Sequence, residues 1–208
     1  MGKIVPFSGP SGVGKTTIVG ELLKRPVLLR DFLEIQKVSL ITSITTRDPR
    51  PDDIPKEYEY VSYDLFDEMK RNGRFAWHTS VRKKQYGTLK TSLEEVYDSE
   101  DTLSFIIITE ETIQILEKFI MSKFKNAHLK YKYYQPLLLS AEESLIKKRL
   151  KNAGISTDNV ARRLSNNTKN KTNNKIISRQ SYSPHTIENN GDILETTENI
   201  IGIIKYFF

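Results

Sequence analysis

Nine consecutive residues near the N-terminus have the types and spacing needed to bind a triphosphate. Residues 9–17 read GPSGVGKTT and satisfy the pattern G-x-x-x-x-G-K-[ST]. In this pattern backbone N–H groups surround an anion, the lysine pairs with the terminal phosphates, and the hydroxyl completes a Mg2+ shell. We predict that ATP and Mg2+ are the ligands. The predicted ATP-binding residues are Gly9, Pro10, Ser11, Gly12, Val13, Gly14, Lys15, Thr16 and Thr17, and the predicted metal ligand is Thr16.

A second cluster of polar residues is suited to a second phosphate. Residues 43–50 read SITTRDPR and place Arg47 and Arg50 three residues apart beside hydroxyl groups. Arginines can hold a phosphate through bidentate, charge-assisted hydrogen bonds, and the phenols of Tyr58 and Tyr86 can add donors. A solvated basic loop is the alternative interpretation of this segment.

The pattern of apolar residues predicts the elements that position these clusters. Short apolar runs predict buried strands at residues 3–7, 37–41, 103–109 and 129–139, although Pro136 limits the hydrogen bonding of the last one. Helical spacing predicts helices at residues 18–24, 110–119, 141–152, from about 157, and 193–208. Alternating strands and helices predict an α/β fold with a parallel sheet covered by helices on both faces.

Residues 43–92 interrupt that alternation with a Pro- and Asp-rich loop, aromatic extended segments and a helix near residues 64–72. We expect one domain over residues 1–208, with a core (1–42, 93–140 and 170–208), a small lobe beside the sheet (43–92) and a helical segment (141–169). Residues 166–175 are rich in Asn and Lys. They are interpreted either as an arm that contacts RNA or phosphate or as a solvated face with biased composition.

Composition excludes several classes of protein. The 208 residues contain no cysteine, so disulfides and thiolate metal sites are excluded. The net charge of +6 fits a cleft for two phosphorylated substrates better than nucleic-acid binding, because no basic stripe is interleaved with aromatic residues. No apolar run approaches the ~20 residues that span a bilayer, and the first strand leaves no room for a signal peptide. We expect a cytoplasmic enzyme, monomeric or homodimeric.

Taken in order, these motifs resemble the guanylate kinase family over most of the chain. The resemblance rests on GPSGVGKTT, SITTRDPR, the Lys-Glu-Tyr segment ending at Tyr58, Tyr-Gly-Thr at residues 86–88, the basic lid segments at 147–150 and 162–164, and Asn189 before the last helix. It implies a P-loop kinase fold in which residues 43–92 are the acceptor-binding lobe and residues 141–169 the helical lid, with a nucleotide substrate and ATP-dependent phosphorylation of GMP or dGMP. The catalytic residues that it implies are Lys15, Arg47, Arg149 and Arg163. The acceptor-binding residues that it implies are Ser43, Arg47, Arg50, Tyr58, Tyr86 and Thr88, and Trp77 is a further candidate that departs from the family, with a sugar-phosphate substrate as the alternative.

The departures from that family concern recognition of the base. Trp77 stands where the family carries a guanine-reading glutamate, and residues 106–109 (IIIT) stand where it carries aspartates. Asp52-Asp53 replaces a Gly-Glu pair, and Ala153 replaces a lid arginine. Trp77-His78 instead resembles the ribose 1,5-bisphosphate phosphokinases, although a core position for Trp77 is an equal alternative. A third alternative is a catalytically inactive guanylate kinase-like binding module, against which the complete phosphate loop argues.

Overall fold

The computed structural model describes residues 1–123, 130–165 and 185–208. A five-stranded parallel sheet forms its centre, with the strand order β2-β7-β1-β8-β9. The strands are β1 (Lys3–Ser8), β2 (Lys37–Leu40), β7 (Thr102–Ile107), β8 (Leu137–Ser140) and β9 (His185–Glu188). The central β1 is buried along nearly its whole length, as expected of a parallel strand covered on both faces.

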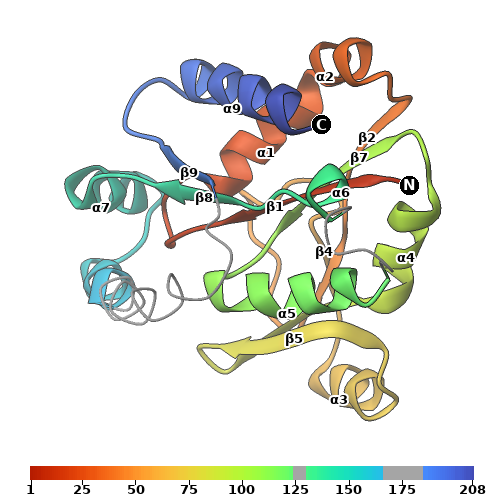
Figure 1. Cartoon of the computed structure of the whole chain (residues 1–208). Coiled ribbons are helices and arrows are strands. Elements are labelled where there is room, and N and C mark those ends of the chain that lie inside the picture. Colours follow the sequence, from red (N-terminus) through yellow and green to blue (C-terminus); the bar gives the residue numbers. More distant parts are fainter. Residues whose placement is uncertain (124–129, 166–184) are drawn as a thin grey trace.

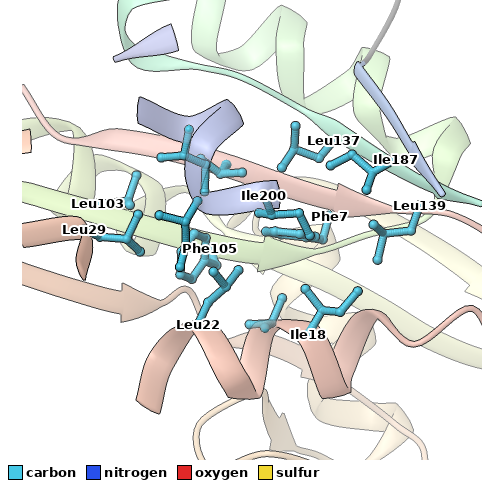
Figure 2. Close-up of a cluster of buried hydrophobic side chains, with 14 of the residues drawn as sticks. Phe7, Ile18, Leu22, Leu29, Leu103, Phe105, Leu137, Leu139, Ile187 and Ile200 are labelled. Carbon is cyan, nitrogen blue, oxygen red and sulfur yellow. The ribbon is translucent and has the colours of Figure 1, made fainter. Parts of the chain in front are cut away.

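Helices cover both faces of this sheet, which confirms the predicted fold class (Figure 1). On one face lie α1 (Lys15–Lys24), α2 (Pro26–Leu33) and α9 (Ile193–Phe207), and on the other lie α4 (Lys90–Asp98) and α5 (Glu110–Met121). Figure 2 shows the core between the sheet and the first group, in which Phe7 and Phe105 meet edge to face beside Leu22 and Ile200. No helix within the described ranges is long and apolar enough to cross a membrane.

A second, four-stranded sheet with the order β4-β3-β6-β5 is built from residues within 43–92. Its strands are β3 (Ser43–Thr45), β4 (Tyr58–Tyr60), β5 (Phe75–Val81) and β6 (Lys84–Leu89). Helix α3 (Tyr63–Arg71) begins at the side-chain cap of Ser62 and packs Phe66 and Met69 against Ile44 and Phe75 on one face of this sheet. The opposite face of the sheet is therefore the one turned toward the rest of the molecule, and β5 packs there on α5 (Figure 1).

A two-residue turn joins β5 to β6. Val81 pairs with Lys84, so Arg82 and Lys83 form the turn, and their φ angles are 54° and 66°. Both angles lie in the left-handed region that hairpin turns of this kind require and that Gly or Asn normally supplies. Holding a residue with a Cβ in this region costs roughly 1–3 kcal/mol.

The prediction of a strand over residues 129–139 is wrong in its first half. Residues Lys130–Tyr133 form the short helix α6, and the strand begins only at Leu137. The Pro136 ring has no N–H to donate, so the chain makes a single bridge from Tyr134 to Ile4 before the continuous pairing of β8 starts. Leu129 lies outside the described residues, as does the Asn- and Lys-rich segment 166–175.

Helix α7 (Glu143–Asn152) and a further helical segment, residues 157–165, follow β8. They pack on one another through Ile146, Leu150 and Val160. Leu150 also lies against Gly12, where an added Cβ would be 2.8 Å from the leucine side chain. The pair of helices is therefore seated over the phosphate loop.

Candidate active site

The phosphate loop connects β1 to α1 and is shaped by close backbone contacts. Gly9 has a φ of 133°, and a Cβ at this position would lie 2.3 Å from the carbonyl oxygen of Leu139. Gly14 has a φ of 101°, and an added Cβ would lie 2.6 Å from the side-chain Nδ2 of Asn189. Only glycine fits either position.

Asn189 fixes the loop from the far end of the chain. Its side chain is buried, donates to the Val13 carbonyl oxygen at 2.7 Å and accepts from the Thr196 hydroxyl at 3.2 Å. Its own N–H donates to the Ser140 carbonyl oxygen at 2.8 Å. The sequence resemblance pointed to Asn189 without a role, and the structure supplies one, because the residue ties the loop to β8 and α9.

Lys15 is curled over the loop. Its Nζ donates to the carbonyl oxygens of Gly9 at 2.6 Å and Pro10 at 3.0 Å. Burial lowers the pKa of Lys15 to about 8, against the opposing effects of the carboxylates of Glu110 and Glu57. A triphosphate can restore the full charge by replacing the missing solvation with anionic oxygens.

The two lid arginines predicted to be catalytic both reach this loop. Arg149, on α7, donates to the Val13 carbonyl oxygen at 3.4 Å. Arg163, in residues 157–165, donates to the Ser11 hydroxyl at 3.3 Å. The structure therefore brings Lys15, Arg149 and Arg163 to one loop, although they are up to 148 positions apart (163 − 15).

The acceptor-side residues lie on one face of the second sheet. Ser43 pairs with Tyr58 across β3 and β4, Trp77 pairs with Thr88 across β5 and β6, and the hydroxyls of Ser43 and Thr88 are 2.9 Å apart. Because directly opposite residues of a sheet share a face, these four side chains form one row. Tyr86 adds its ring to this face, 6.1 Å from that of Tyr58.

Arg47 is the most completely coordinated side chain of the acceptor side. It is 6% exposed, and its guanidinium lies 4.6 Å above the centre of the Tyr58 ring. Both terminal nitrogens bind the Asp53 carboxylate, one of them at 2.8 Å. Asp53 also accepts from the Tyr60 hydroxyl at 2.5 Å and from the Arg50 N–H at 2.7 Å. Arg47 is therefore already paired with an anion inside the protein.

The charges of this group are fixed over the neutral pH range. Burial alone would lower the pKa of Arg47, but the Asp53 carboxylate more than offsets this and raises it. Burial would raise the pKa of Asp53, and the hydrogen bonds from Arg47, Tyr60 and Arg50 lower it instead. Burial, the hydrogen bond to Asp53 and the charge of Asp53 raise the pKa of Tyr60 to about 12.

Glu57 is a buried carboxylate that the sequence reasoning did not identify as functional. It is 5% exposed, accepts from the Ile54 N–H at 3.3 Å, and burial raises its pKa. Ile54 lies against Gly20 of α1, where an added Cβ would be 3.4 Å from the isoleucine Cγ2. The turn that carries Asp53 and Glu57 therefore packs directly on the helix of the phosphate loop.

Two predicted acceptor residues differ from the others in their surroundings: Arg50 is not on this sheet face, and Trp77 is on it but is buried among apolar side chains. Arg50 is exposed and interacts electrostatically with Arg163 rather than joining Arg47. Trp77 is 4% exposed and packs among Leu93, Ile106 and Ile113, and its indole N–H has no hydrogen-bond partner within the described residues. These contacts favour a core position, and its predicted contact with an acceptor remains a prediction.

The arrangement can hold two anions side by side. One is surrounded by the phosphate loop, Lys15 and the lid arginines, and the other faces the row of hydroxyls and phenols on the second sheet. Sequence reasoning missed Asp53 and Glu57, since only the folded chain brings them to Arg47 and Lys15. The available signals were the Asp-rich composition of residues 48–53 and the Lys-Glu-Tyr segment that contains Glu57.

Comparison with known proteins agrees with this geometry. A family model described as guanylate kinase matches residues 1–127. The guanylate kinase of Mycoplasmoides gallisepticum is 30% identical over 208 residues, which cover 99% of this chain and 93% of that protein. The guanylate kinase of Mycoplasma mobile is 33% identical over 119 residues. That match covers 57% of this chain and about half, 55%, of the relative's length.

A solved structure shares the fold. The crystal structure of guanylate kinase from Anaplasma phagocytophilum matches with a TM-score of 0.60 and 21% identity, over 99% of this chain and 85% of that one.

Proposed function

The chain belongs to the guanylate kinase family, and we propose that it transfers the terminal phosphoryl group of ATP to GMP or dGMP, forming ADP and GDP or dGDP. The observation that carries this proposal is the juxtaposition of two separate anion-binding groups. Lys15 of the phosphate loop interacts electrostatically with Glu57, which directly precedes the acceptor-side Tyr58. A donor on the loop and an acceptor on the second sheet would thus meet end to end.

In this reaction the protein would position the two substrates and neutralise charge, and no covalent intermediate with the protein would form. The phosphate loop would hold the donor, with Lys15 moving from the carbonyl oxygens of Gly9 and Pro10 to the terminal phosphates. Arg149 and Arg163 would neutralise charge on the phosphoryl group in transfer, as donors placed where charge develops. An acceptor phosphate would take hydrogen bonds from Arg47, Tyr58 and Tyr86.

The residues present are compatible with Mg2+ bound together with ATP. Thr16 follows Lys15 in the first turn of α1 and is partly exposed at the loop. The described residues contain no group of three or more His, Cys, Asp or Glu side chains that could hold a metal alone. This fits a Mg2+ that takes most of its ligands from phosphate and water. When bound, it would neutralise the charge of the β- and γ-phosphates, and Thr16 would hold it.

We propose the same division into moving parts that the sequence suggested. Residues 43–92 would act as the acceptor-binding lobe, and the described helices of residues 141–165 as a lid. The contacts of Arg149 and Arg163 with the loop support a lid that lies close to the donor site. Closure of both parts would exclude water from the transferring group.

Recognition of the base is the part of the proposal that departs from the family pattern. Trp77 occupies the position of a guanine-reading carboxylate and is buried against apolar side chains. Ser43 and Thr88, joined by their hydroxyls, are the polar groups beside it on the same face. Losing a hydrogen-bonding carboxylate reduces discrimination between bases by a large factor.

An ADP-release assay with Mg-ATP and a panel of acceptors tests the proposal. The panel comprises GMP, dGMP, AMP, CMP, UMP and ribose 1,5-bisphosphate. We expect turnover with GMP and dGMP above all others. Turnover with ribose 1,5-bisphosphate alone would replace guanylate kinase by the sugar-phosphate kinase activity, and ATP binding without any turnover would contradict an enzymatic function.

A further inference from the structure

The turn between β5 and β6 holds two cationic residues in an unfavourable backbone conformation. Arg82 and Lys83 are the two central residues, with φ angles of 54° and 66°. Neither is Gly or Asn, the residues that this turn normally uses. Strained positions of this kind cluster at binding and catalytic sites, so the side chains at the tip of this hairpin call for a functional explanation.

Arg82 belongs to a group of four arginines contributed by three separate segments. Arg50 comes from the loop after β3, Arg82 from the hairpin tip, and Arg162 and Arg163 from the helical residues 157–165. Arg82 interacts electrostatically with Arg162 and Arg50, and Arg163 interacts with Arg82, Arg50 and Arg162. Desolvation and these neighbouring charges lower the pKa of both Arg82 and Arg163, although the Arg82 side chain is exposed at the hairpin tip and Arg163 is only half-buried.

This arginine group lies at the phosphate loop. Arg163 donates to the Ser11 hydroxyl at 3.3 Å, which places this member of the group at the donor site, and Arg82 and Arg50 are within electrostatic reach of it. Its Nε is buried and has no hydrogen-bond partner in the described part of the chain. A buried N–H without a partner is energetically costly, and an anionic oxygen bound at this place would satisfy it.

The electrostatic balance of the group favours a polyanion. Of the four charged side chains that act most strongly on Arg163, three are arginines and one, Asp52, is acidic. Like charges brought together in a partly desolvated place repel one another, and an anion among them removes that repulsion. A planar guanidinium also matches the geometry of phosphate oxygens.

We propose that Arg82 is a further catalytic residue, which reaches from the tip of the β5–β6 hairpin to the phosphates at the junction of donor and acceptor. The inference rests on the proposed phosphoryl transfer. Arg82 would join Arg163 in neutralising the equatorial oxygens of the group in transfer. The acceptor-side sheet thereby contributes a charge to the donor side, and the strained turn holds that charge in place.

The turn itself supplies a matched pair of variants. Arg82→Gly and Lys83→Gly each remove one positive charge and each replace a strained left-handed residue by glycine. Neither variant is expected to lose thermal stability, because glycine adopts positive φ freely. The two variants therefore differ in the guanidinium of Arg82 and not in their effect on folding.

Wild type and both variants are compared in two measurements. The first is steady-state GMP phosphorylation, and the second is the affinity for inorganic tripolyphosphate, determined by calorimetry at fixed ionic strength. We expect Arg82→Gly to lower kcat/KM and tripolyphosphate affinity each by about 10- to 100-fold, the effect of losing one charge-assisted hydrogen bond. Lys83→Gly should stay within about twofold of wild type in both. Equal behaviour of the two variants, whether both are active or both impaired, would overturn the proposal.

The two measurements separate this inference from the proposed function. If wild type binds tripolyphosphate in an Arg82-dependent way but phosphorylates no mononucleotide, the proposed function fails and the arginine site stands. If wild type phosphorylates GMP and Arg82→Gly matches wild type in both measurements, the function stands and the inference fails.

Discussion

The phosphate loop and the acceptor-side sheet both bind anions in our proposal, but they are built in different ways. The loop is nine consecutive residues that present backbone N–H groups. Its Lys15 donates to two loop carbonyl oxygens and interacts electrostatically with the carboxylates of Glu110 and Glu57. The sheet gathers side chains from four strands, and Arg47, which follows β3, is hydrogen-bonded to the Asp53 carboxylate through both terminal nitrogens. On the donor side the cation is thus held by backbone oxygens, whereas on the acceptor side it is held in a bidentate ion pair.

The donor half (the phosphate loop with Lys15) and the acceptor half (the second sheet with Arg47) should therefore respond differently to their substrates. A triphosphate entering the loop would bring anionic oxygens to Lys15 and restore the charge that burial suppresses. A monophosphate approaching Arg47 meets the Asp53 carboxylate and must share the guanidinium or replace one of its two bonds. We expect turnover to fall when the positive charge of the donor half is removed, and the KM for the acceptor to rise when the planar guanidinium of the acceptor half is replaced by another cation.

The largest expected effect is on the donor half. Lys15→Ala should lower turnover by about 1000-fold or more, because it removes the cation nearest the transferring group. Far-ultraviolet circular dichroism and the Tm should stay close to wild type, since the buried Lys15 charge does not stabilise the fold. Lys24→Ala, on the exposed end of α1, is the matched control and should keep full activity. Retained turnover in Lys15→Ala would show that the donor half does not depend on the Lys15 charge.

A smaller effect is expected when the acceptor half keeps its charge but loses its geometry. Arg47→Lys should raise the KM for GMP by about 10- to 100-fold, because an ammonium group cannot replace the planar fork over Tyr58 and beside Asp53. The affinity for ATP should not change. The same substitution at exposed Arg71 is the control. An unchanged KM for GMP would show that charge alone matters on both sides.

The smallest expected effect is the uptake of a proton on binding of ATP, with less uptake on binding of GMP. Free Lys15 has a pKa of about 8, against an ordinary value of 10.5, so the free enzyme loses this proton as the pH rises through 8. Bound triphosphate would keep Lys15 protonated, so ATP binding at pH 8 should take up about half a proton, and less at lower pH. Calorimetry in two buffers of different ionisation enthalpy measures this uptake, and Lys15→Met should abolish it.

The same shift has a consequence for the free protein. Because the unfolded chain holds the Lys15 proton more tightly than the folded one, this group makes the free protein more stable as the pH rises from 8 toward 10.5. GMP binding should show less proton uptake than ATP binding, since Arg47, Asp53 and Tyr60 keep their charge states near neutrality. Equal uptake for both substrates would contradict the contrast between the two halves.

Much of the fold was predictable because its signals are local. The apolar runs of β1, β2 and β7 and the helical spacing of α1, α5 and α9 were read from neighbouring residues, and the structure confirms those elements. The predictions did not include α2, α4 or β9. Residues 130–133 were predicted as a strand and form a helical turn. Continuous hydrogen-bonded pairing with β1 starts only after Pro136, because proline has no N–H to donate.

The sequence by itself determined the phosphate loop, since its function lies in consecutive backbone groups and in glycines that no other residue could replace. Tertiary structure alone decided the partners: Asp53 beside Arg47, Asn189 hydrogen-bonded to Val13, Trp77 in the core, and Arg82 within electrostatic reach of Arg163. Each of these depends on strand register or on packing between segments far apart in the chain. A spacing pattern can specify which residues carry charge, but only the folded chain decides which opposite or like charge lies beside each of them.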